Sequence, residues 1–257
     1  MALFGFDVKT ISRLRRESVS KTTAYILREN VYDAYQGKTH YYSHVQDCIH
    51  KEILLPDIAP QEFRVLGNLL AEIDKAEKRY DARTGRVIRL TLPNDKEFSD
   101  SEQIALAKTF VMENFVSRGM CAIMAVHEGR NSDPAKNNPH VHVILTDRPV
   151  DANGFCTKKD RSWNRRELVE TCRQRWAELQ NTAYREKGME IQVSHKSLEV
   201  QGIAREPTLP LGRAATALER KGIQTERGNR NREILAKQRE REEQRILHRK
   251  RNRDRSR

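Results

Sequence analysis

Two short apolar runs, one ending and one beginning in histidine, constrain the fold of this chain most strongly. They are MCAIMAVH (residues 120–127) and HVHVILTD (residues 140–147). Both have the length and composition of buried strands and are too short for ordinary helices. The polar segment between them returns the chain, so we expect two antiparallel strands that lie side by side.

The histidines of these runs are candidate metal ligands. Residues i and i+2 of a strand point to the same face, so His140 and His142 project together. His127 closes the preceding strand, and antiparallel pairing would bring its ring towards the other two. Three neutral imidazoles can hold a divalent cation and leave positions open for a substrate. The alternative is a hydrogen-bonded surface pair without metal, because the HxH spacing alone fits both.

A tyrosine on the first predicted helix is a candidate nucleophile. Tyr25 lies in KTTAYILREN, in a helix that we expect from Ser20 to Gly37. A metal that polarises phosphoryl oxygens still needs a nucleophile, and a tyrosyl phosphoester preserves the bond energy for the reverse reaction. Tyr32 and Tyr35 lie further along the same predicted helix. Composition alone favours a packing role for each of these tyrosines.

The remaining sequence predicts further strands and helices. Ser99 and Glu102 form a capping-box pattern for a helix that ends at Gly119, and Asn164 with Glu167 predicts another that ends at Gly188. A third helical pattern runs over residues 61–83. Further strands are expected at residues 3–9 and 86–93, with strands or a hairpin arm at residues 39–45 and 48–56.

The charge distribution predicts a polyanionic partner and a separate tail. The formal net charge is +12; residues 227–257 hold 13 Lys/Arg and 5 Asp/Glu, net +8, which leaves +4 for the rest. Lysine and arginine that neutralise phosphates release counterions and gain affinity. We therefore expect a folded domain over residues 1–226 and a basic, helical or disordered tail over residues 227–257. No apolar run is long enough to span a bilayer, so no membrane insertion is expected.

Several segments together resemble the MobA/MobL family of plasmid mobilisation relaxases, which are HUH-type endonucleases. The resemblance runs from Leu3 to about Glu233. It rests on the AY helix, ILLP, AEKRYDAR before LTLP, the AVH strand, NPHVHVILTDR, the Trp-containing helix and SHKSLEVQGIAREPTLPLG followed by ALERKGIQTERGNRNREI. The histidine pair, in order with the AY helix and the LEVQGI segment, makes the match highly specific.

The resemblance implies a fold, a reaction and partners. The fold is α+β, with a central antiparallel sheet flanked by helices. Tyr25 matches the nucleophile, which nicks one strand at a plasmid origin of transfer, forms a 5′-phosphotyrosyl adduct and rejoins the strand after transfer. His127, His140 and His142 match the ligands of a divalent metal, Mg²⁺ or Mn²⁺, with other transition metals as alternatives. The implied partners are single-stranded or supercoiled plasmid DNA, relaxosome accessory proteins and a type IV coupling protein, in the bacterial cytoplasm.

The chain departs from the family pattern at an acidic position. Val87 stands where many members have a glutamate, and Arg89 stands where some members are acidic. A carboxylate near the metal or the tyrosine would therefore come from elsewhere, and Glu77 is the candidate. A solvated helix residue is the alternative for Glu77.

Two basic clusters are the candidate DNA contacts, because a nicking enzyme must hold a single strand in a basic groove. Both are predicted next to segments that border the site. Their members are Arg15, Arg16, Lys21 and Arg28 around the tyrosine helix, and Lys158, Lys159 and Arg161 beside Trp163.

Three alternatives remain. A rolling-circle replication initiator shares the HUH chemistry, but such proteins generally place the tyrosine after the histidine pair. A noncatalytic DNA-binding relative fits the missing acidic position. A three-histidine hydrolase of small molecules fits neither the basicity nor the absence of an HExxH motif.

Overall fold

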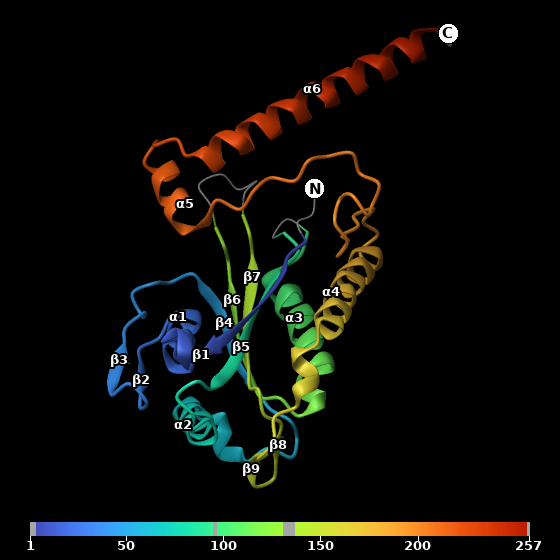
Figure 1. Cartoon of the computed structure of the whole chain (residues 1–257). Helices are drawn as coiled ribbons and strands as arrows, with labels where there is room; N and C mark the ends of the chain where they lie inside the picture. Colours follow the sequence, from blue (N-terminus) through green and yellow to red (C-terminus); the bar gives the residue numbers. More distant parts are fainter. Residues whose placement is uncertain (1–3, 95–96, 131–136, 256–257) are drawn as a thin grey trace. The chain divides into compact units, whose positions relative to one another are not determined.

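The computed structural model describes residues 4–94, 97–130 and 137–255. Its residues form two compact units, Met1–His195 and Lys196–Arg257. The first unit holds the sheet (Figure 1). Its residue range also includes the three histidines of the predicted site. The predicted boundary between a domain and its tail, at residues 226/227, lies later than this division and coincides with the start of the last helix.

A five-stranded antiparallel sheet forms the centre of the first unit, in the order β1-β5-β7-β6-β4. This confirms the predicted fold class. The strands are β1 (Phe6–Ser12), β4 (Cys48–Leu54), β5 (Arg83–Thr91), β6 (Ala122–His127) and β7 (His140–Leu145). Two small hairpins, β2 (Val31–Asp33) with β3 (Lys38–His40) and β8 (Val150–Asp151) with β9 (Gly154–Phe155), complete the β structure.

Helices cover both faces of this sheet (Figure 1). On one face, α3 (Asp100–Asn114) and α4 (Arg166–Glu186) pack on Val141, Val143 and alternate residues of β6. On the other face, α1 (Val19–Leu27) and α2 (Leu66–Ala76) pack on Ile144 and the remaining residues of β6. Because β6 is buried on both faces, its sequence is almost continuously apolar rather than alternating.

Several local predictions are confirmed. The strands at MCAIMAVH and HVHVILTD form and pair antiparallel, with His127 opposite His140. The Ser99–Glu102 capping box is present, and it begins α3. A residue in the left-handed conformation, Gly119 with φ 91°, follows that helical region as expected.

The predicted boundaries of three helices are wrong. Helix α1 ends at Leu27, because Arg28 adopts the left-handed conformation (φ 56°), and Tyr32 lies in a strand rather than one face of a longer helix. The helical pattern at residues 61–83 yields a 3-10 turn and the shorter α2. Asn164 does not cap α4: Arg165 precedes the helix without a side-chain cap, and the Asn164 side chain accepts a hydrogen bond from Arg83.

The second unit contains two helices, α5 (Gly212–Arg220) and α6 (Glu226–Arg255). The Asn231 side chain bonds both the N–H and the C=O of Leu209, and Arg232 forms an ion pair with Glu219 of α5. The predicted basic tail is therefore helical from Glu226 and carries contacts of its own. Among the described residues no helix is long and apolar enough to cross a membrane.

Candidate metal and tyrosine site

The three predicted histidines meet at one end of the central strands. His127 ends β6, and His140 and His142 begin β7, on the face that α1 covers. Their ring centroids lie 4.9–5.2 Å apart, and one ligand atom of each lies within 4.8 Å of the others. The structure thus brings together three imidazole nitrogens in an arrangement that can hold one metal ion.

Backbone carbonyl groups fix the orientation of two of these rings. His127 Nε2 lies 2.7 Å from the carbonyl oxygen of Ile26, and His140 Nδ1 lies 2.8 Å from that of Asn138. A carbonyl only accepts, so these nitrogens carry the protons and the opposite nitrogens keep their lone pairs. This is the usual way in which a second hydrogen bond sets the tautomer and orientation of a metal-binding histidine.

The donor set fits a divalent cation. His127 Nδ1 and His142 Nδ1 are buried and have no hydrogen-bond partner among the described residues. A buried nitrogen without a partner is costly, and a cation would satisfy it. Burial lowers the pKa values of His127 and His140 and lowers that of His142 to about 3. The rings are therefore neutral near pH 7, which is the form that binds metals.

Tyr25 lies beside this cluster on the last turn of α1. The next residue, Ile26, supplies the carbonyl oxygen that holds His127. The Tyr25 side chain is 41% exposed, and its ring meets that of Tyr42 edge-on at 5.5 Å between centroids. The guanidinium carbon of Arg28 lies 4.5 Å from the centroid of the Tyr25 ring. Tyr25 thus directly precedes the residue whose backbone contacts His127, and its ring is accessible to solvent.

The carboxylate at this site is Asp47, which the sequence analysis missed. Asp47 precedes β4, and its carboxylate binds Arg28 through two hydrogen bonds of 2.6 and 2.9 Å. Its backbone carbonyl accepts the N–H of Glu128, directly after His127. The Arg28 guanidinium holds the pKa of Asp47 below its usual range. Its proximity follows from the pairing of β4 with β6, which no short sequence motif indicates.

Gly129 is a second residue that the sequence analysis missed. It has φ 57°, and a Cβ there would lie 1.9 Å from the carbonyl oxygen of Asn138. The backbone N–H of Asn138 donates to the Gly129 carbonyl at 2.9 Å. Because that same Asn138 oxygen holds His140, only glycine permits this approach. A glycine two residues after a strand histidine was the available sequence signal.

The two residues at the positions where family members are often acidic, Val87 and Arg89, make contacts of other kinds. Val87 packs against the hydrophobic cluster that α1 and α2 form on this face, and Arg89 lies opposite His142 in the strand register. The Arg89 guanidinium binds Asp7 of β1 at 2.5 Å.

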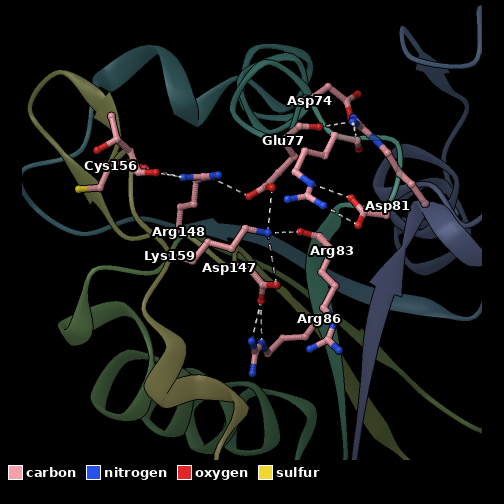
Figure 2. Close-up of polar contacts among 12 residues, drawn as sticks. Asp74, Glu77, Asp81, Arg83, Arg86, Asp147, Arg148, Cys156 and Lys159 are labelled. Carbon is pink, nitrogen blue, oxygen red and sulfur yellow. Dashed lines mark hydrogen bonds and ion pairs between the residues drawn. The ribbon is translucent and has the colours of Figure 1, made fainter.

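Glu77 lies at the opposite end of the sheet, so it does not supply a carboxylate to the histidines. It is 5% exposed and forms ion pairs of 2.8 Å with both Arg148 and Lys159 (Figure 2). Arg148 follows the end of β7, whereas His140 begins it. Five residue steps of roughly 3.3 Å along β7 separate the two ends by roughly 17 Å.

The predicted DNA contacts divide between these two ends. Arg28 is at the histidine site, and Lys21 lies one turn before Tyr25 on the exposed face of α1. The other five are near the Glu77 end. Arg15 and Arg16 follow β1, whose last residue pairs with Arg83, and Lys159 donates to the Arg83 carbonyl. Lys158, Lys159 and Arg161 line one surface hollow with Arg148.

Comparison with known proteins shows the family. The MobA/MobL family model matches residues 17–221. The chain is 27% identical to the probable mobilization protein MobA of Bifidobacterium longum (strain NCC 2705), over 91% of this chain and 47% of that protein. It is 28% identical to the mobilization protein MobL of Acidithiobacillus ferridurans, over 86% of this chain and 65% of that protein.

Longer relatives and a solved structure agree with this match. The chain is 29% identical to the conjugal transfer protein TraA of Agrobacterium fabrum (strain C58 / ATCC 33970), over 87% of this chain but 22% of TraA. A solved structure described as "Molecular Basis of Vancomycin Resistance Transfer in Staphylococcus aureus" superposes with TM-score 0.68 at 29% identity. The match covers 76% of this chain and all of that one. The chain belongs to the MobA/MobL family, and it spans about half or less of the MobA and TraA relatives.

Proposed function

We propose that this chain is the nicking and strand-transfer part of a plasmid mobilisation protein, with Tyr25 as its nucleophile. One observation carries the proposal: the residue after Tyr25 holds His127 of the three-histidine cluster through a 2.7 Å hydrogen bond. The tyrosine and the cluster are therefore linked rather than merely near each other. The names of the mobilization and conjugal transfer relatives support a DNA substrate at an origin of transfer.

Arg28 and Asp47 orient the nucleophile. Arg28 donates to the Tyr25 backbone carbonyl at 2.6 Å, and its guanidinium lies over the Tyr25 ring. Asp47 holds that guanidinium with two hydrogen bonds, so the side chain of Arg28 has few orientations open to it. We assign Arg28 first to positioning Tyr25, and contact with a DNA phosphate is a second role for the donors that stay free.

His127, His140 and His142 would hold a divalent cation. When bound, the cation supplies positive charge that stabilises the charge developing on the nonbridging phosphate oxygens. Three imidazoles accept Mn²⁺, Co²⁺, Ni²⁺ and Zn²⁺ more readily than Mg²⁺. Mn²⁺ is therefore the metal of choice for a first assay, with Mg²⁺ beside it.

The reaction balances without any further reactant. The Tyr25 phenol oxygen forms a bond to the scissile phosphorus, and the bond from phosphorus to the 3′ oxygen breaks. The phenol loses a proton and the leaving 3′ oxygen gains one, which gives a 3′-hydroxyl and a 5′-phosphotyrosyl ester. Because one ester replaces another, attack by a 3′-hydroxyl on the adduct can rejoin the strand and release Tyr25.

The basic residues of both ends are proposed to hold the DNA backbone. Lys21 and Arg28 flank the nucleophile; Arg16, Lys158 and Arg161 form no ion pair with any described residue and are free to meet phosphates at the Glu77 end. Arg15 and Lys159 are ion-paired with Glu17 and Glu77, so they contribute less. Relaxosome accessory proteins and a coupling protein remain proposed partners, and the bacterial cytoplasm the proposed location.

A covalent-adduct assay tests the proposal. The protein is incubated with Mn²⁺ or Mg²⁺ and labelled single-stranded oligonucleotides that tile the DNA flanking its gene. A denaturant-resistant adduct is expected with the wild type and with Tyr32→Phe, the matched control, and no adduct with Tyr25→Phe. An adduct that survives Tyr25→Phe would move the nucleophile to another tyrosine, and oligonucleotide binding without any adduct would favour a noncatalytic relative.

The same assay separates mobilisation from replication initiation. Tyr25 precedes the histidine pair, whereas initiators of the rolling-circle type generally place the tyrosine after it. A nick mapped inside a transfer origin supports mobilisation, and a nick mapped inside the replication origin of the element would support the initiator.

A further inference from the structure

Tyrosines concentrate around the β2–β3 hairpin. The chain has seven tyrosines, and five of them lie within an 18-residue segment: Tyr25, Tyr32, Tyr35, Tyr41 and Tyr42. Three of the five are more than half exposed, at 62% for Tyr32, 52% for Tyr35 and 69% for Tyr41. Several large exposed rings in one short segment mark a surface that binds something.

The hairpin is held firmly, so these rings have defined positions. Asp33 of β2 is fully buried and accepts hydrogen bonds from the Ser18 hydroxyl and the Gln36 N–H. His40 of β3 lies 3.3 Å from the same carboxylate. Ser18 also caps α1, so the hairpin is tied to the start of the tyrosine helix. Tyr32, between buried Val31 and Asp33, therefore faces solvent by strand alternation.

The tyrosines of the hairpin form one aromatic surface with Tyr25, the proposed nucleophile. The Asn30 side chain accepts the backbone N–H groups of Tyr42 and Ser43, which fixes the turn after β3. The Tyr42 ring in turn meets the Tyr25 ring edge-on. At the other end of the hairpin, the Arg13 guanidinium covers one face of Tyr35 at 3.8 Å. The aromatic surface thus begins beside Tyr25 and extends along the hairpin.

We propose that Tyr32 and Tyr41 form a stacking surface for the bases of single-stranded DNA next to the scissile phosphate. Aromatic rings bordered by cations bind single strands by stacking, with little dependence on sequence. Lys21, Arg28 and Lys38 supply the cations, and continuity with Tyr25 places the surface where the proposed substrate must pass. The inference rests on the single-strand substrate of the proposed function and adds the contact that holds its bases.

Binding of an unreactive probe tests this surface. Fluorescein-labelled dT12 is titrated into the whole chain in EDTA, so that no cleavage occurs. Tyr32→Ala and Tyr41→Ala are each expected to weaken binding by about fivefold or more, the loss expected for one stacked base. Tyr32→Phe and Tyr41→Phe should stay within about twofold, because phenylalanine keeps the ring face. Ile58→Ala removes a side chain of similar exposure elsewhere in the same unit and is the matched control.

Two further measurements keep the outcome decisive. Photocrosslinking with 5-iodo-deoxyuridine in place of one thymidine should label peptides that contain Tyr32 or Tyr41. A 12-base-pair duplex should bind all variants equally, since its bases are not free to stack. Unchanged dT12 affinity in folded alanine variants would overturn the proposal, as would light scattering that showed these tyrosines pairing two copies of the chain.

The result does not depend on nicking. Weakened dT12 binding with no Tyr25 adduct would retain the stacking surface and remove the proposed reaction. A Tyr25 adduct, together with undiminished dT12 binding by the alanine variants, would retain the proposed reaction and remove the stacking surface.

Discussion

The two ends of the central sheet both gather ionisable side chains, yet they differ in how those ionisable groups are paired. At the histidine end, two buried ring nitrogens lack a partner among the described residues, and a half-exposed tyrosine lies beside them. At the Glu77 end, Glu77 is ion-paired with Arg148 and Lys159. A cluster of buried ionisable groups without partners is typical of a ligand site, whereas buried ionisable groups that pair with one another are typical of a structural network.

The Glu77 end joins three segments that are distant in sequence. Glu77 follows α2, Arg148 follows β7, and Lys159 precedes α4 (Figure 2). A neighbouring pair, Arg86 with Asp147, is buried at 2.7 Å, and Arg86 also donates to the Trp163 carbonyl. The network therefore fastens loops around the edge of the sheet, and its removal should affect folding rather than chemistry.

The largest effect is expected from His142→Ala. Loss of a ligand should lower Mn²⁺ affinity by more than the roughly 100-fold that follows loss of an outer-shell partner. Isothermal titration calorimetry measures it, and His44→Ala, an exposed histidine outside the cluster, is the control. Unchanged affinity would remove His142 from the ligand set.

Glu77→Gln should affect stability alone. Breaking a buried ion pair costs about 3–5 kcal/mol, and the partial exposure of Arg148 and Lys159 reduces the expected loss to about 2–3 kcal/mol. Urea unfolding measures it, with Glu72→Gln in the exposed Glu72–Lys75 pair as the control, at under about 0.5 kcal/mol. A weaker Mn²⁺ affinity in folded Glu77→Gln would contradict the purely structural role assigned to the Glu77 end.

Gly129→Ala should weaken the metal site without touching a ligand. The added Cβ must displace the Asn138 carbonyl that holds His140, so Mn²⁺ affinity is expected to fall about 10- to 100-fold. Calorimetry on the folded variant checks this result. Gly67→Ala, in α2 with open space around its Cα, should leave affinity as it is. Equal affinities in the two variants would contradict the role of the carbonyl.

The smallest effect is expected from Asp47→Asn, which loosens Arg28 but leaves the cluster intact. The single-turnover rate of adduct formation should fall about tenfold, because the nucleophile is less well oriented. Affinities for Mn²⁺ and for dT12 should stay unchanged, and Asp47→Glu should restore part of the rate. Asp57→Asn, an exposed aspartate in a turn, is the control. A fall in dT12 affinity instead of rate would make DNA contact, rather than the positioning of Tyr25, the main role of Arg28.

Strand periodicity was enough to predict the histidine cluster. The two-residue repeat placed His140 and His142 on one face, and antiparallel return placed His127 opposite His140. The Ser99–Glu102 capping box was equally local and was also correct. These features depend on neighbours in sequence or on one strand pairing, so a single sequence contains them.

Contacts between distant segments were not predictable in the same way. Asp47 lies at the histidine site only because β4 pairs with β6. Glu77 lies at the opposite end of the sheet, where it forms ion pairs with Arg148 and Lys159. The end of α1 was also missed, because its apolar spacing continues while Arg28 turns into the left-handed conformation to meet Asp47. That tertiary ion pair outweighs helix propensity at this position.

The pairing of His127 with His140 separates the geometry of the cluster from the sequence that links the two strands. Spacing between the rings is set by β6 and β7 themselves, and the pairing is closed by Gly129 and Asn138. Substitutions within β6 or β7 that keep this pairing should therefore leave the imidazoles in register.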